Sequence, residues 1–73
     1  MNSTAAIHRG VIIEIRDEGT YAVHTCPQSM QCVAVVDVDG TLMSAELRCN
    51  RSVGDYVELY VYRSGRVWVR CWH

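Results

Sequence analysis

The chain has 73 residues, of which 49% are hydrophobic and 21% are charged, and its formal net charge is −1. This length allows one small domain, residues 1–73, and leaves little room for a deep catalytic cavity. No apolar run approaches the roughly 18 residues of a membrane span. Residues 1–6 also lack the basic and apolar segments of a signal peptide. We therefore expect a cytoplasmic protein without a membrane segment.

The charge is divided unevenly along the chain. Residues 1–47 hold two arginines and six acidic residues, a net charge of −4, whereas residues 48–73 hold five arginines and two acidic residues, a net charge of +3. All seven basic residues are arginine, which forms planar, bidentate and stacking contacts that lysine does not. A GC-rich genome would explain the arginines equally well, but it would not explain the asymmetry.

Alternating residues and turn signals predict strands throughout the chain and no helix. Residues 1–8 are expected to form a loosely attached tail, and the first strand is expected to begin near Gly10. Pro27 should end the second strand because proline cannot donate a ladder hydrogen bond. Asp39-Gly40 predicts a tight hairpin turn. The predicted strands cover residues 10–16, 21–26, 32–38, 41–48, 56–62 and 66–73.

The last two of these strands predict a β-hairpin. Both alternate in character, and only Arg63-Ser64-Gly65 separates them. A three-residue loop with Gly65 in the left-handed region sorts the side chains onto two faces. The pairs expected on the apolar face are Val61–Val67, Leu59–Val69 and Val57–Cys71. The pairs expected on the outer face are Tyr62–Arg66, Tyr60–Trp68, Glu58–Arg70 and Tyr56–Trp72.

Short strands separated by turns favour an all-β fold, a small five- or six-stranded antiparallel barrel. The spacing of Arg9-Gly10-Val11-Ile12, Asp39-Gly40, Val53-Gly54-Asp55-Tyr56-Val57 and Gly65-Arg66-Val67 resembles small OB-fold domains, among them the first bacterial translation initiation factor. The stretch from Ala34 to Val61 also resembles small hydrogenase-maturation chaperones, but these need a cysteine after the initiator methionine, where this chain has Asn2. An SH3-like barrel is the alternative fold.

The outer face of the hairpin is the candidate binding site. Single-stranded nucleic acid is bound by aromatic rings that stack on bases and by cations that follow the phosphates. The same residue types are enriched in protein–protein interfaces, so a protein partner or self-association is the alternative. Rings that only cover a second apolar layer would be a third explanation. The candidate residues are Tyr60, Tyr62, Arg66, Trp68, Arg70 and Trp72, with Arg48, Arg51 and Arg63 extending the cationic track.

The cysteines and histidines raise the question of a metal site. His24, Cys26, Cys71 and His73 could form a tetrahedral zinc set if the second and last strands were neighbours. No two cysteines have the close spacing of a zinc knuckle, however, and Cys71 is in phase with apolar residues. A disulfide between Cys26 and Cys32 is a further alternative. We expect free, mostly buried thiols, with no metal and no cofactor.

Catalytic signals are weak. His24 is the only local base for a Cys26 nucleophile, and no third group is placed to orient it. Asp37 and Asp39 adjoin the Gly40 turn, where aspartate forms local hydrogen bonds, and Glu14, Glu46 and Glu58 fit solvent-facing strand positions. The sequence therefore predicts a small accessory protein that binds a partner and is not an enzyme.

Overall fold

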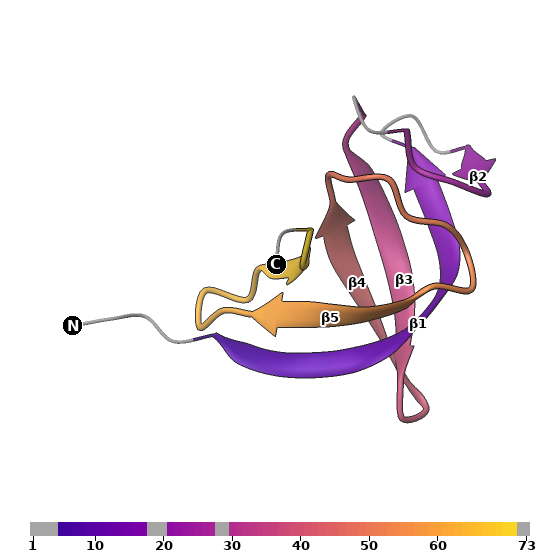
Figure 1. Ribbon diagram of the computed structural model, residues 1–73. Helices are drawn as coiled ribbons and strands as arrows, with labels where there is room; N and C mark the ends of the chain where they lie inside the picture. Colours follow the sequence, from indigo (N-terminus) through magenta and orange to yellow (C-terminus); the bar gives the residue numbers. More distant parts are fainter. Residues whose placement is uncertain (1–4, 18–20, 28–29, 72–73) are drawn as a thin grey trace.

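The computed structural model describes residues 5–17, 21–27 and 30–71, and this part of the chain is all β (Figure 1). No helix in it is long and apolar enough to cross a membrane. The strands are β1 (Ala6–Asp17), β2 (Ala22–Val23), β3 (Cys32–Val38), β4 (Thr41–Leu47), β5 (Tyr56–Val61) and β6 (Val67–Val69).

Five of these strands form a closed barrel. The sheet order is β2-β1-β3-β4-β6-β5, and β1 also pairs with β5, so the ring closes and β2 lies outside it. The predicted all-β barrel is therefore confirmed. It is mixed and not purely antiparallel, because β4 and β6 run parallel and pair through Glu46 and Trp68. Two strands that are not consecutive in the chain meet here, a pairing that local alternation does not reveal.

The first strand is shared between two sides of the ring. Ala6–Val11 pair with β5, and Val11–Asp17 pair with β3. The register shifts between Ile12 and Glu14, where the strand bends, and Figure 1 shows the resulting strong curvature of β1. The strand begins at Ala6 and not near Gly10. Of the expected tail, residues 6–8 belong to β1, held by backbone pairing with β5 although their side chains are exposed.

The second strand is shorter than predicted. Only Ala22 and Val23 pair with β1, whereas the prediction covered Tyr21 to Cys26. The following backbone turns to the connection between β4 and β5: the Val53 N–H donates to the His24 carbonyl, and the Cys26 N–H donates to the Arg51 carbonyl, both at 2.9 Å. These hydrogen bonds pair backbone groups of His24 and Cys26 with the β4–β5 connection and not with β1. The strand therefore ends early, at Val23.

The two hairpins agree with the predicted turns. Asp39 and Gly40 have φ values of 51° and 88°, the positive values that a tight turn requires. In the C-terminal hairpin Gly65 has φ 92°, and the Tyr62 N–H donates to the Arg66 carbonyl at 2.9 Å. The expected strand pairs Val61–Val67, Tyr60–Trp68 and Leu59–Val69 are confirmed. The predicted Tyr56–Trp72 pair lies partly outside the described residues.

The barrel interior is an apolar core with no buried polar or charged side chain among the described residues. Alternate residues of each strand point inward, as period two requires. The core consists of Ile12, Ile15, Cys26, Cys32, Ala34, Val36, Ala45, Leu47, Cys49, Val57, Leu59 and Val69.

The expectation of four free thiols is wrong. Cys49 and Cys71 form a disulfide, while Cys26 and Cys32 are free and buried. Because β4 and β6 lie side by side, the residues that follow them come within a Cα–Cα distance of 5.8 Å, well inside the range a disulfide needs. The cytoplasmic location stays a prediction that the structure does not test.

The disulfide should make a large contribution to stability. It joins residues 22 apart, and closing a loop of that length removes enough unfolded-state entropy to contribute about 3 kcal/mol. We expect the Cys49→Ala/Cys71→Ala double variant to be less stable by about that amount in urea denaturation. Titration of the unfolded wild type should find two thiols before reduction and four after it. A reductant that lowers the melting temperature of the double variant as much as that of the wild type would contradict this account.

Gly10 should be intolerant of any side chain. A Cβ at this position would lie 2.3 Å from the backbone oxygen of Asp37 and 2.9 Å from Cγ1 of Val36. Because the first of these atoms is backbone, β3 would have to move away from β1. We expect Gly10→Ala to destabilise the protein by about 1–3 kcal/mol or more, measured by urea denaturation. The exposed Ser44→Ala is the control and should stay within about 0.5 kcal/mol.

Candidate functional site

Two adjoining hollows mark the outer surface of the C-terminal hairpin, which we call the hairpin face. The first measures about 460 Å³ and the second about 560 Å³, and both are bordered by Tyr62 and Trp68. The first is completed by Arg63, Ser64 and Arg66. The second is completed by Arg48, Tyr60, Val69, Arg70 and Cys71. Aromatic and cationic side chains therefore surround both.

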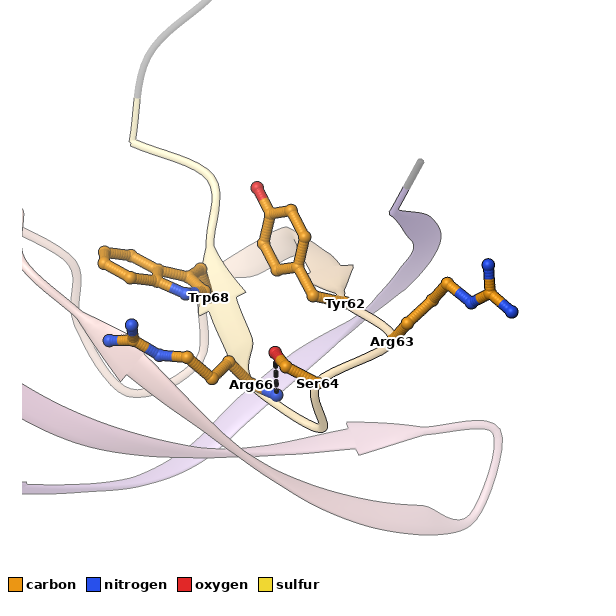
Figure 2. Close-up of a pocket in the computed structure, with 5 residues that line it drawn as sticks. All are labelled: Tyr62, Arg63, Ser64, Arg66 and Trp68. Carbon is orange, nitrogen blue, oxygen red and sulfur yellow. Dashed lines mark hydrogen bonds between the residues drawn. The ribbon is translucent and has the colours of Figure 1, made fainter. Parts of the chain in front are cut away.

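Strand pairing places the rings of the hairpin face. Tyr60 lies opposite Trp68 on β6, and Tyr62 follows two residues after Tyr60 on the same side. The two tyrosine rings meet edge to face, with centroids 6.5 Å apart. All three rings are half-buried. Figure 2 shows Tyr62 and Trp68 on two sides of the first hollow, while Arg63 extends away from it.

Two arginines lie against the Trp68 ring. The guanidinium carbon of Arg48 is 4.6 Å from the ring centroid, and that of Arg66 is 4.8 Å away. Figure 2 shows the Arg66 side chain running beneath the indole. These distances are within the range of cation–π attraction. Arg48 follows β4 and Arg66 precedes β6, so the parallel strand pair brings both cations to the ring.

Glu46 joins these two arginines, a role that no local sequence pattern indicates. Its carboxylate accepts hydrogen bonds from Nε and Nη2 of Arg66 at 3.1–3.2 Å, and it lies 3.7 Å from Nη2 of Arg48. From the sequence alone, Glu46 fits an ordinary solvent-facing strand position. The role of Glu46 depends on its parallel pairing with Trp68, which joins two strands that are far apart in the sequence.

A second carboxylate bridges two arginines on the same side of the barrel. Glu58 accepts a hydrogen bond from Nη1 of Arg70 at 2.6 Å, as the predicted cross-strand pair requires, and another from Nε of Arg9 at 3.0 Å. The hydrogen bond from Arg70 holds the pKa of Glu58 below its ordinary value of 4.5, and Arg9 adds to this effect. The same pairing raises the pKa of Arg70.

Seven of the nine predicted binding residues come together, and Arg51 does not. Tyr60, Tyr62, Trp68 and the arginines at 48, 63, 66 and 70 border the hollows. Arg51 lies in the connection before β5 and donates to the neighbouring Asn50 carbonyl, away from both hollows. Trp72 lies outside the described residues.

The alternative zinc set does not assemble. Cys71 is bonded to Cys49, His24 is exposed while Cys26 is fully buried, and His73 lies outside the described residues. The strand that was expected to align His24 with Cys26 ends at Val23. No group of three potential metal ligands occurs in the described part of the chain.

The Cys26 thiol is also poorly suited to act as a nucleophile. Burial raises its pKa to about 12, and a hydrogen bond and charge repulsion involving Cys32 add to the shift. A reactive cysteine needs the opposite, a lowered pKa and solvent access.

Comparison of the chain with protein-family models, with curated proteins and with solved structures finds no match. The resemblance to OB-fold domains therefore rests on the turn pattern and on the barrel alone. The described part of the chain is a small closed mixed β-barrel with one strand outside the ring.

The Glu58 ion pairs should make stability depend on acid pH. Because the folded-state pKa of Glu58 lies below its ordinary value, the ionised carboxylate stabilises the fold above the unfolded-state pKa, and this contribution is lost as the pH falls through the folded-state pKa. We expect Glu58→Gln to be less stable than the wild type at pH 7, and the difference to shrink between about pH 5 and pH 3. Urea denaturation across this range measures it. A constant difference would show that the ionisation of Glu58 does not contribute.

Proposed function

We propose that this protein is a non-enzymatic module that binds single-stranded nucleic acid on the hairpin face. The observation that carries the proposal is the first hollow, where Tyr62 and Trp68 border an open space next to Arg66. Such a space suits an unpaired base that stacks on a ring while its phosphate contacts a guanidinium. Either RNA or DNA fits this chemistry.

The local charge supports this proposal more than the whole-chain charge does. The side of the barrel that includes the hairpin face holds Arg9, Arg48, Arg63, Arg66 and Arg70 against Glu46 and Glu58, so its net charge is +3 although the chain as a whole carries −1. A local excess of positive charge attracts phosphates, while each stacked base contributes about 1–3 kcal/mol. A short strand could therefore bind with few phosphate contacts.

For the fold we propose an OB-like barrel, with an SH3-like barrel as the alternative. The support is the order of the ring, in which the first strand closes on the fourth and the third runs parallel to the last. OB-folds bind oligonucleotides on the face of their second and third strands. Glu46 and Arg48 lie on and directly after β4, the third strand of this ring, so the hairpin face adjoins that surface.

A protein partner or a second copy of the chain on the same face is the second candidate. The observation in its favour is Ile7, which is 51% exposed and pairs with Tyr60 at the side of the hairpin face. An exposed aliphatic side chain next to aromatic rings and arginines is typical of a protein interface.

The two candidates predict different results for one substitution. If single-stranded nucleic acid is the ligand, Tyr62→Ala should weaken binding by about 1–3 kcal/mol through the loss of a stacked base. Affinity should also fall with salt, with a logarithmic slope of about −0.7 per phosphate neutralised. Tryptophan fluorescence titration with single-stranded oligonucleotides at two salt concentrations measures both quantities.

Tyr21→Ala is the matched control, because Tyr21 is 74% exposed and lies beside β2, away from both hollows. It should bind as the wild type does. If single-stranded oligonucleotides do not quench the tryptophan fluorescence of the wild-type protein at low salt, the nucleic-acid proposal is overturned. A concentration-dependent mass in sedimentation that Tyr62→Ala abolishes would then favour self-association.

A further inference from the structure

Glu46 occupies a position in the hairpin face that a bound phosphate would need. Its carboxylate is held side-on by Nε and Nη2 of Arg66, with three contacts of 3.1–3.2 Å. Arginine offers the same fork of donors to carboxylates and to phosphates. The Arg66 fork is therefore a preformed anion site whose occupant is a side chain of the protein itself.

The surroundings of Glu46 keep this anion site in place. Arg66 and Arg48 both stack on Trp68, which pairs directly with Glu46 across β4 and β6. The disulfide of Cys49 holds the residue after Arg48 close to the residue after Arg70. The two cations are thus positioned by contacts that do not involve Glu46, and they would remain beside Trp68 if the carboxylate left.

The carboxylate is also free to leave. Its side chain is 25% exposed, and the arginine side chains that hold it are 50% and 56% exposed. Ion pairs between side chains this exposed to solvent are weak because water and salt screen them. Rotation of Glu46 into solvent would therefore cost little compared with the contacts that a phosphate makes in its place.

We propose that Glu46 is an internal competitor for the phosphate backbone of the nucleic acid, an inference that rests on the proposed function. A bound strand places a phosphate on the Arg66 fork, and the Glu46 carboxylate moves into solvent. Part of the binding free energy is spent on this displacement, so Glu46 lowers the affinity for all strands. Ligands that add base stacking on Tyr62 overcome this competition, whereas simple anions do not.

Removal of the Glu46 charge should strengthen binding. We expect Glu46→Gln to bind an oligothymidylate of about eight nucleotides about three- to tenfold more tightly than the wild type, as expected from the loss of two exposed ion pairs. The logarithmic salt slope should become steeper by up to about 0.7, because Arg66 would no longer be neutralised in the free protein. Glu46→Ala should give the same result without an amide that could bond to Arg66.

Glu14→Gln is the matched control. Glu14 forms an ion pair with Arg16 on β1, away from the hairpin face, so this variant changes the net charge equally and also removes one surface ion pair. Circular dichroism verifies that each variant is folded.

The titration distinguishes failure of the competitor role from failure of the proposed function. Tighter binding by both Glu46 variants and not by Glu14→Gln supports the competitor role. If the wild type binds and the Glu46 variants bind no more tightly than Glu14→Gln, the competitor role is overturned and the proposed function stands. If the oligonucleotide quenches the tryptophan fluorescence of neither the wild type nor any variant at low salt, the proposed function and this inference are both wrong.

Discussion

The structure depends on the first strand being able to pair on both sides of the barrel. β1 supplies hydrogen bonds to β5 with its first half and to β3 with its second half, and its pairing with β5 closes the ring. This sharing requires a close approach between β1 and β3 at Gly10, and a bend at the register shift after Ile12. Hydrophobic burial then follows, because only the closed ring covers the inward side chains of all five strands.

The line of contact between β4 and β6 connects the fold with the candidate site. Only Glu46 and Trp68 pair there, and side-chain contacts at the edges of the pair supplement this short backbone contact. On the outside these are the ion pairs and ring contacts of Arg48 and Arg66, and beyond the strand ends there is the Cys49–Cys71 disulfide. The side chains that join these two strands on the outside therefore also border the candidate site.

Features that depend on neighbouring residues could be predicted from the sequence, whereas those that depend on distant strands could not. The β3 bounds, the Asp39-Gly40 turn and the register of the C-terminal hairpin follow from alternation and glycine positions, and with them the grouping of Tyr60, Tyr62 and Trp68. The β4–β6 pairing leaves no local pattern, so its consequences were missed. These are the mixed barrel, the role of Glu46 and the disulfide.

Closure of the ring also determines when the domain can fold during its synthesis. β1 leaves the ribosome first, but its partner β5 and the final strand β6 come last. Until then the β3–β4 hairpin can form, while the apolar sides of β1 and β3 remain exposed. Such surfaces are prone to aggregation in a nascent chain, and pairing of strands so distant in sequence is slow. Formation of the Cys49–Cys71 bond must likewise wait for the last strand, so this bond marks the completed barrel.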